Sequence, residues 1–332
     1  MKTTRRKFIT GSMLATAGLS TGLNVLAGAV RNDSNKSEFA PKINDEFSIS
    51  IFSKHLQWLD YKEMAKVAAD MGFDGIDLTV RPNGHVLPEN VEKDLPLAMD
   101  AVTKAGLKIF MITTGVYDAE DPLSERVLKT ASSLGIRHYR MGYGYYEDGK
   151  RVEENIRIVN HKLAQLAILN EKYSISGEYQ NHSGNYGSGI YFGGPVWDIA
   201  ASLKQINSPW LGSQYDIYHA TVEGANAWPI GLELISPYIR SIDVKDFQWV
   251  KKDDKWSSET VPLGQGMVDY KRYFGILKQY KITCPISIHY EYPLGGSEHG
   301  NKVLTIKRDA VISAMRKDIT TLKKYMQESK LV

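Results

Sequence analysis

The chain has 332 residues, of which 42 % are hydrophobic, so it is long and apolar enough to bury the core of one α/β domain. Its 41 basic and 38 acidic side chains give a net charge of +3. This balance, without a long basic stripe, argues against a nucleic-acid partner. The single cysteine, Cys284, excludes an internal disulfide and a metal cluster held by several cysteines.

The first 30 residues are typical of a twin-arginine export signal. An Arg-Arg pair at positions 5–6 precedes bulky apolar residues, a mildly apolar Gly/Ala/Thr-rich stretch and a small-residue region. Polar residues interrupt the apolar stretch, so it is a poor membrane span, which needs ~20 strongly apolar residues. We expect a signal peptide over residues 1–30, a polar linker over 31–45, and export to the periplasm or beyond. The alternative is an ordinary N-terminal segment.

From residue 46 to residue 328, short apolar runs alternate with amphipathic segments, which is the rhythm of a parallel sheet covered by helices. Strands are predicted over 48–52, 75–81, 108–113, 138–142, 175–182, 212–218, 241–245 and 285–291. Helices are predicted over 61–71, 91–105, 124–134, 153–173, 195–206, 229–235, 270–280 and 307–328. The eight pairs favour a closed (β/α)8 TIM barrel. An open sheet would usually carry a Gly-rich phosphate turn after its first strand, and this chain has none there.

Five of the predicted strands place ionisable or amide residues on one parity, and most of these strands have apolar residues on the other. Because side chains of a strand point to opposite faces in turn, these polar groups share the face that lines the barrel. They are Asp77 and Arg81; Glu178, Gln180 and His182; Gln214 and Asp216; Asp243 and Lys245; and His289 and Glu291. Such a polar interior is costly unless its members pair or bind something. The set therefore predicts a functional site, and the alternative is a group of buried ion pairs that only hold the barrel.

Carboxylates and imidazoles at strand ends suit a divalent metal such as Mn²⁺, Zn²⁺, Co²⁺ or Mg²⁺. A metal of this kind can polarise a sugar carbonyl or hydroxyl and stabilise an enediolate. The candidates for catalytic proton transfer are Glu178, His182, Asp216 and Glu291, with Asp243 and His289 also considered. The candidates for substrate binding are Asp77, Arg81, His219 and Lys245. For Lys245 the alternatives are pairing with Asp243 and a solvated lysine at the end of a strand, and for Arg81 the alternative is an arginine of a surface loop.

Aromatic residues are frequent in the segments expected to lie around the barrel mouth. They are Tyr143, Tyr145, Tyr146, Tyr186, Trp249 and Trp256. Stacking on a sugar ring is one use of such residues, and packing of a lid over the mouth is the other.

The chain resembles the xylose isomerase-like TIM-barrel superfamily of sugar isomerases, epimerases and related dehydratases. The resemblance spans about residues 47–325 and is carried by the segments 72–78 (GFDGIDL), 179–182 (YQNH), 216–219 (DIYH), 239–246 (IRSIDVKD), 263–269 (LGQGMVD) and 286–291 (ISIHYE). The resemblance implies a TIM barrel and, in members with known chemistry, one divalent metal held by Glu, Asp, His and Glu from strands five to eight.

Transferred to this chain, the implied metal ligands are Gln180, Asp216, Asp243 and His289. Asp216 matches the family pattern, whereas Gln180 replaces a Glu, with Glu178 two residues earlier. Asp243 and His289 look like an exchange of acid and imidazole between neighbouring strands. The resemblance also makes a homo-oligomer possible.

The leading hypothesis is therefore an exported isomerase, epimerase or lyase that acts on a small sugar-like substrate with the help of a metal. The alternative is a non-catalytic carbohydrate-binding barrel that has lost its metal, which the neutral Gln180 favours and the remaining acids and imidazoles disfavour. A phosphodiesterase is disfavoured because the early strands lack the imidazoles of a three-metal cluster. A sugar phosphate is disfavoured because no phosphate-binding loop is evident.

Overall fold

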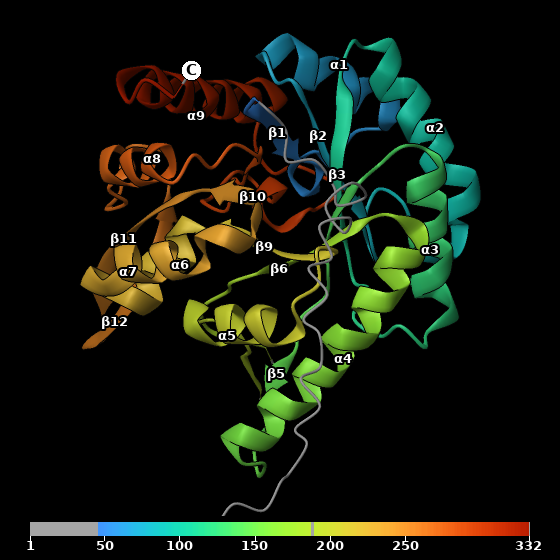
Figure 1. The fold of residues 1–332 in the computed structure, drawn as a ribbon. Helices are drawn as coiled ribbons and strands as arrows, with labels where there is room; N and C mark the ends of the chain where they lie inside the picture. The colour runs from blue at the N-terminus through green and yellow to red at the C-terminus, as the bar shows by residue number, and fades with distance from the viewer. Residues whose placement is uncertain (1–45, 187–188, 332) are drawn as a thin grey trace, which may run out of the picture. The chain divides into compact units, whose positions relative to one another are not determined.

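Eight parallel strands close into a barrel in the computed structural model, which describes residues 46–186 and 189–331. The predicted signal peptide and linker lie outside these described residues. The barrel strands are β1 (Ser48–Phe52), β2 (Gly75–Val80), β3 (Lys108–Thr114), β4 (His138–Arg140), β6 (Ser176–Gln180), β9 (Leu211–Asp216), β10 (Ile239–Val244) and β13 (Pro285–Ile288). Their order around the barrel follows the chain, and β13 closes it against β1. The prediction of a (β/α)8 barrel is confirmed (Figure 1).

Helices surround the barrel strands (Figure 1). They are α1 (Tyr61–Met71), α2 (Val91–Lys104), α3 (Pro122–Ser133), α4 (Val152–Tyr173), α5 (Val196–Ile206), α6 (Ile217–Gly224), α7 (Trp228–Ile235), α8 (Tyr270–Gln279) and α9 (Arg308–Glu328). Short 3-10 helices span Ser53–Leu56, Pro88–Asn90, Ala225–Ala227, Ser236–Tyr238 and Ser297–His299. Each α-helix except α6 was predicted, and its ends lie within two residues of the predicted ends. No helix in the described part of the chain is long and apolar enough to cross a membrane.

Helix α1 shows how local sequence sets these elements. The Asp60 side chain accepts a hydrogen bond from the backbone N–H of Glu63 and so caps the first turn. Gly72 ends the helix with a positive φ of 89°, a conformation that a residue without a Cβ adopts easily. Between these two ends, Met64 and Met71 belong to the buried face that packs on the barrel.

The alternation predicted for the strands divides the interior into two layers. Ile76 and Leu78 of β2 belong to the buried hydrophobic core, whereas Asp77 between them accepts hydrogen bonds from Ser287 of β13 and Thr113 of β3. The strand thus turns one face to the helices and the other into the barrel. Directly before β13, the single cysteine Cys284 is fully buried in the apolar layer.

The sixth barrel strand ends earlier than predicted. The strand expected over 212–218 stops at Asp216, whose side chain accepts a hydrogen bond from the backbone N–H of His219 and caps helix α6. Tyr218 is therefore a helical residue. The strands expected over 175–182 and 285–291 also end early, at Gln180 and Ile288, since the chain leaves the sheet at the barrel mouth.

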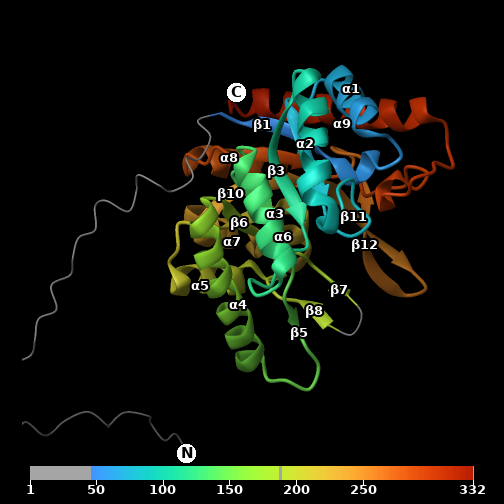
Figure 2. The ribbon, with the colours of Figure 1, turned by 90° about the vertical axis from the view of Figure 1, so that its right-hand side faces the viewer.

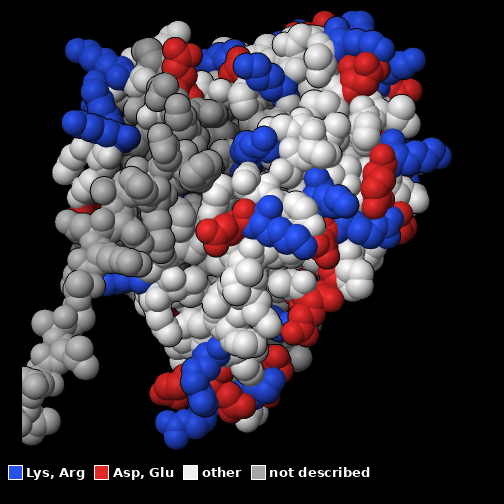
Figure 3. Space-filling model, turned by 45° about the vertical axis from the view of Figure 1, so that its right-hand side comes forward, with Lys and Arg blue, Asp and Glu red and all other residues white. Residues whose placement is uncertain are grey.

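Two small sheets that were not predicted follow barrel strands at their carboxyl ends. The first contains β5 (Tyr145–Tyr146), β7 (Asn185–Tyr186) and β8 (Gly189–Tyr191), and the second is a hairpin of β11 (Asp246–Lys252) and β12 (Lys255–Val261). In Figure 2 both lie on the same side of the barrel, and the hairpin projects from it. Basic and acidic side chains alternate over the face drawn in Figure 3, in keeping with the balanced charge.

Candidate active site at the barrel mouth

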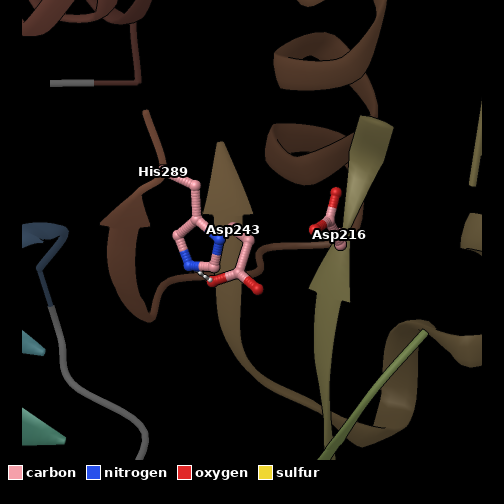
Figure 4. A group of neighbouring side chains, drawn as sticks. All are labelled: Asp216, Asp243 and His289. Atoms are coloured by element: carbon pink, nitrogen blue, oxygen red, sulfur yellow. Dashed lines mark ion pairs between the residues drawn. The ribbon is translucent and has the colours of Figure 1, made fainter. Parts of the chain in front are cut away.

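Three ionisable side chains from adjacent strands meet at the carboxyl end of the barrel (Figure 4). Asp216 ends β9, Asp243 is its register partner on β10, and His289 follows β13. One ligand atom from each lies within 4.8 Å of the others, and all three side chains are buried. His289 Nε2 is 3.3 Å from Asp243 Oδ1. The strand alternation and the closed strand order together bring these residues to one point.

The fourth predicted ligand, Gln180, joins this group from the end of β6. Its Nε2 lies 2.9 Å from Asp216 Oδ2 and 2.6 Å from Asp243 Oδ2, so the amide donates to both carboxylates. Its Oε1 accepts hydrogen bonds from the Arg140 guanidinium at 2.9 Å and from the Tyr143 hydroxyl. The structure therefore brings all four predicted metal ligands together.

The donor set fits a divalent cation. Both ring nitrogens of His289 are buried without a hydrogen-bond partner in the part of the chain that the structure describes. A buried polar atom without a partner is costly, and two carboxylates converge on the same point. Imidazole nitrogen and carboxylate oxygen are ligands that Mn²⁺, Zn²⁺ and Co²⁺ accept. Asp216, Asp243 and His289 would thus hold the ion, with Gln180 beside them.

Burial controls the protonation of this cluster. Desolvation, opposed by Arg140 and Lys245, raises the pKa of Asp243 to about 7. Desolvation and the neighbouring Asp243 raise the pKa of Asp216 to about 6, although Lys245 acts in the opposite direction. Burial, with the charge of Lys245, holds the pKa of His289 well below its usual value. The imidazole is therefore neutral, which is the form that binds a metal.

Lys245 joins the cluster to the outer edge of the site. Its Nζ lies 3.2 Å from Asp216 Oδ2, 3.0 Å from Glu291 Oε2 and 2.8 Å from His219 Nε2. The alternative that Lys245 pairs with Asp243 is wrong, because Asp216 and Glu291 are its acidic partners. Burial alone would lower the pKa of Lys245, but these two carboxylates raise it, so the ammonium stays charged.

Glu291 is the carboxylate of the site that solvent can reach, with 27 % of its side chain exposed. Lys54 lies 3.3 Å from its Oε1, on the side away from Lys245. Burial alone would raise the pKa of Glu291, but Lys245 and Lys54 outweigh it and hold this pKa well below its usual value. Glu291 is therefore an ionised base at neutral pH.

Two histidine rings lie against each other beside Lys245. The ring centroids of His182 and His219 are 3.9 Å apart. Nε2 of His219 lies 2.8 Å from the Lys245 ammonium, and its Nδ1 lies 2.7 Å from the Ser183 hydroxyl and 3.1 Å from the backbone nitrogen of Ser183. His182 Nδ1 lies 2.8 Å from the Ser183 carbonyl and must donate, which leaves Nε2 of His182 as an acceptor. Burial lowers the pKa of His182 to about 3, so this ring is neutral.

Glu178 lies apart from the metal-ligand candidates. One carboxylate oxygen is 2.6 Å from Nδ1 of His138, and the other accepts a hydrogen bond from the Ser241 hydroxyl. The side chain is fully buried, and both oxygens are occupied. This arrangement matches the alternative considered for the barrel interior, a buried pair that holds the strands together, rather than the predicted catalytic role.

The two remaining candidates for substrate binding lie on or just after β2. Asp77 is buried between Thr113 and Ser287, and desolvation together with the charge of Asp243 raises its pKa to about 7. Arg81 directs its guanidinium over the ring of Phe52, with Cζ 5.3 Å from the ring centroid. Asp77 is thus held by its neighbours, whereas Arg81 is placed at the mouth.

Sequence reasoning missed Arg140, although a signal for it was present. Residues 138 and 140 of the fourth strand are both basic and have the same parity, which places both side chains inside the barrel. Arg140 is 5 % exposed and contacts Gln180. Gln214, which donates to Asp243 Oδ1 at 2.8 Å, supports the cluster from the same face of β9.

Aromatic side chains lie near β8 and on the hairpin. Near β8, the ring centroids of Tyr143 and Tyr191 are 4.8 Å apart, and those of His182 and Tyr191 are 4.4 Å apart. On the hairpin, Trp249 and Trp256 are 40 % and 65 % exposed. Stacking on a sugar remains a prediction for these residues, and nothing is described of the Tyr186 side chain.

Known proteins resemble this chain over most of its length. A family model described as a xylose isomerase-like TIM barrel matches residues 65–308. A Haemophilus influenzae protein, provisionally assigned as an L-ribulose-5-phosphate 3-epimerase, is 23 % identical over 245 residues, which cover 68 % of this chain and 81 % of that protein.

Solved structures show the same fold. The D-allulose 3-epimerase from Methylomonas sp., in complex with D-allulose, is 16 % identical with a TM-score of 0.62, and the match covers 86 % of this chain and 99 % of that one. The 3-keto-D-glucoside 4-epimerase from E. coli is 11 % identical with a TM-score of 0.60, covering 83 % of this chain and 100 % of that one.

Proposed function

Because this chain belongs to the xylose isomerase-like TIM-barrel family, we propose that it is an isomerase, epimerase or related lyase of a sugar or keto-sugar. The observation that carries the proposal is the cluster of Asp216, Asp243 and His289, flanked by the ionised Glu291 and by Lys245. The sugar epimerase activities that the names of the similar proteins state support it.

A divalent cation bound by Asp216, Asp243 and His289 would polarise a carbonyl or hydroxyl of the sugar and favour loss of a proton from the adjacent carbon. The residues fit such an ion because two carboxylates and a neutral imidazole without a partner converge. Binding of the metal is part of what we propose.

Glu291 is assigned as the base that takes the proton from carbon. It is ionised, partly exposed and held on two sides by Lys54 and Lys245, which fix its position. Lys245, held between Glu291 and Asp216, places a positive charge where an enediolate oxygen would develop one negative charge. These two residues supply the acid–base and electrostatic parts of the reaction.

A second proton-transfer group would distinguish an epimerase from an isomerase or a lyase. His182 follows β6 and Glu291 follows β13, so they flank the cluster from two sides of the barrel. Like Glu291, His182 has a lowered pKa, about 3, so both groups are unprotonated at neutral pH, and the Nε2 atom of His182 is free to accept a proton. An isomerase or a lyase needs Glu291 alone.

Elemental analysis of the purified protein tests the proposal first. Wild-type protein incubated with Mn²⁺, Zn²⁺, Co²⁺ or Mg²⁺ should retain close to one ion per chain, and Asp216→Ala should not. Loaded protein is then assayed by NMR in deuterated water with a panel of sugars and keto-sugars, where exchange at a carbon next to the carbonyl reports the proton transfer. If the wild type retains no ion under any of these conditions, the metal-assisted reaction is wrong.

A non-catalytic carbohydrate-binding barrel is the second candidate, and the neutral Gln180 between the two acids favours it. Sugar binding without deuterium exchange would support this alternative. Gln180→Glu restores the carboxylate that the resemblance implies, so it should raise metal affinity if the amide is what weakened the site.

We also propose that residues 1–30 direct export by the twin-arginine route. Cell fractionation of the full-length protein should place it outside the cytoplasm. Replacement of the arginine pair at 5–6 by lysines should retain the protein in the cytoplasm. An unchanged distribution in that variant would reject the route.

A further inference from the structure

Three cationic groups gather on one aromatic ring at the barrel mouth. Arg81 Cζ, Arg140 Cζ and Lys54 Nζ lie 5.3, 5.5 and 5.9 Å from the ring centroid of Phe52. The same ring stacks on His289 at 4.4 Å with an interplanar angle of 23°. The cations therefore lie directly beside the candidate metal site, on the side of β1, β2 and β4.

Two of the three cations have donors that no described residue uses. Lys54 is paired with Glu291. Arg140 donates from one nitrogen to Gln180, but its Nε is buried without a partner among the described residues, and no carboxylate is within ion-pair distance of it there. Arg81 makes no side-chain hydrogen bond or ion pair within residues 46–186 and 189–331, so most of the five N–H groups of each guanidinium are available.

Arg81 and Arg140 repel each other, and neither has a carboxylate within ion-pair distance among the described residues, although Asp243, Asp77 and Glu291 lie near enough to raise the pKa of Arg140. Burial, together with the charge of Arg140, lowers the pKa of Arg81 to about 10. The contact with Phe52 offsets this repulsion only in part, because a cation–π contact contributes about 0.5–2 kcal/mol. The arrangement is favourable when a negatively charged group lies between the two and accepts their hydrogen bonds.

The charge balance of the mouth points the same way. The described residues place four carboxyl groups and four cationic groups there, namely Asp77, Asp216, Asp243 and Glu291, against Lys54, Arg81, Arg140 and Lys245. A bound divalent ion would give this balanced set an excess of positive charge. A neutral sugar would leave that excess uncompensated, whereas an anionic one would balance it.

We propose that Arg81 and Arg140 form a binding subsite for an oxyanion of the substrate, a carboxylate or a phosphate. The substrate is then an anionic sugar, either a sugar acid or a sugar phosphate. This inference rests on the proposed function, because it assigns the substrate class of the same site. Arg81 follows β2, which lies across the barrel from β9, and Arg140 ends β4, which β6 separates from β9. The anionic group would anchor one end of the sugar while the cluster faces the reacting carbons.

Binding of small oxyanions to the metal-free protein tests the subsite without any turnover. Full-length protein treated with EDTA and dialysed is titrated by calorimetry with glycolate and with inorganic phosphate, and with ethylene glycol as the neutral probe. One oxyanion should bind saturably, one per chain, and ethylene glycol should not. Because hydrogen bonds to a charged group contribute about 1.5–3 kcal/mol, Arg81→Gln should weaken this binding about tenfold or more.

The matched control is Arg126→Gln on α3, because that arginine is exposed and pairs with Glu92 far from the mouth. It should leave oxyanion binding unchanged. Arg140→Gln is the stronger test if thermal unfolding shows that the variant folds, and Arg81→Gln serves alone if it does not. Tighter binding of glycolate identifies a sugar acid as the substrate class, and tighter binding of phosphate identifies a sugar phosphate.

The inference is overturned if neither oxyanion binds saturably or if Arg81→Gln binds as the wild type does. Failure of the proposed function looks different. Oxyanion binding without metal retention or deuterium exchange would leave the subsite intact and reject the metal-assisted reaction. Exchange with neutral sugars at the rate seen with anionic ones would reject the subsite and keep the reaction.

Discussion

Glu178 and Glu291 are two carboxylates of one barrel interior with opposite environments. Glu178 is fully buried, and His138 and Ser241 occupy both of its oxygens. Glu291 is partly exposed and lies between two lysines that keep it ionised. A barrel can therefore use the same residue type to join strands in its interior and to hold a reactive charge at its mouth. The difference lies in the partners and in access to solvent.

Glu291→Gln should have the largest effect on activity and a smaller effect on stability. Loss of the base should lower kcat by about 10²–10⁴-fold, as is typical when a general base is removed. The melting temperature should change by no more than a few degrees, because the side chain is partly exposed. Steady-state assays and thermal unfolding of the same sample measure both. A variant with full activity would remove Glu291 from the mechanism.

Glu178→Ala should lower stability and change activity little. Removal of one partner of a buried pair leaves His138 and Ser241 without their acceptor and should cost about 3–5 kcal/mol of unfolding free energy. Denaturant titration measures this loss. The activity per folded molecule should change little. A stable variant that has lost activity would show that Glu178 takes part in the reaction after all.

The contributions of the cluster and of Glu291 to the unfolding free energy should change with pH in opposite directions. The raised pKa values of Asp243, about 7, and Asp216, about 6, mean that the metal-free folded state holds protons that the unfolded chain releases. Its unfolding free energy should therefore fall as pH rises from 5 to 7, by about 2 kcal/mol for Asp243 alone. Glu291 acts in the opposite sense, because its lowered pKa adds stability above about pH 4.5 that is lost on acidification.

Asp243→Asn tests this assignment because the amide keeps the shape and cannot titrate. The slope of stability between pH 5 and pH 7 should become shallower in the variant than in the wild type. Denaturant titrations at several pH values in the presence of EDTA measure the slope. Equal slopes would mean that other groups titrate in this range.

The smallest change in unfolding free energy is expected for an ion pair on the surface. Lys66 and Asp70 on α1 are 2.6 Å apart, closer than Lys54 and Glu291 at 3.3 Å, but both side chains are more than half exposed. Asp70→Asn should therefore change the unfolding free energy by no more than about 0.5 kcal/mol. A larger loss would show that distance rather than burial decides the strength of ion pairs in this protein.

Most of the fold could be predicted from periodicity, because alternating strands and amphipathic helices follow one another regularly along the chain. The grouping of Asp216, Asp243 and His289 followed from strand parity and the closed strand order. Where strands end was harder to predict, since Asp216 both ends β9 and caps α6. A capping acid and a strand residue look the same in the sequence.

Contacts between side chains could not be predicted. Parity places Gln180 inside the barrel but does not show that its amide bridges two acids and an arginine. In the same way, proximity in sequence offers Asp243 as one possible partner of Lys245, whereas Asp216 at the end of β9 and His219 on α6 are the residues that lie beside it. Distances across a barrel depend on rotamers and on loop paths, which one sequence does not encode locally.

Reaction of the single cysteine with a thiol reagent can report the opening of the barrel. Cys284 is fully buried directly before β13, and burial raises the pKa of its thiol. Since a thiol reagent reacts with the exposed thiolate, labelling requires the strand that closes the barrel to detach first. Because no other cysteine is present in the chain, the rate of labelling in native buffer reports barrel opening without an engineered probe. A bound metal or oxyanion that bridges the strands should slow that rate.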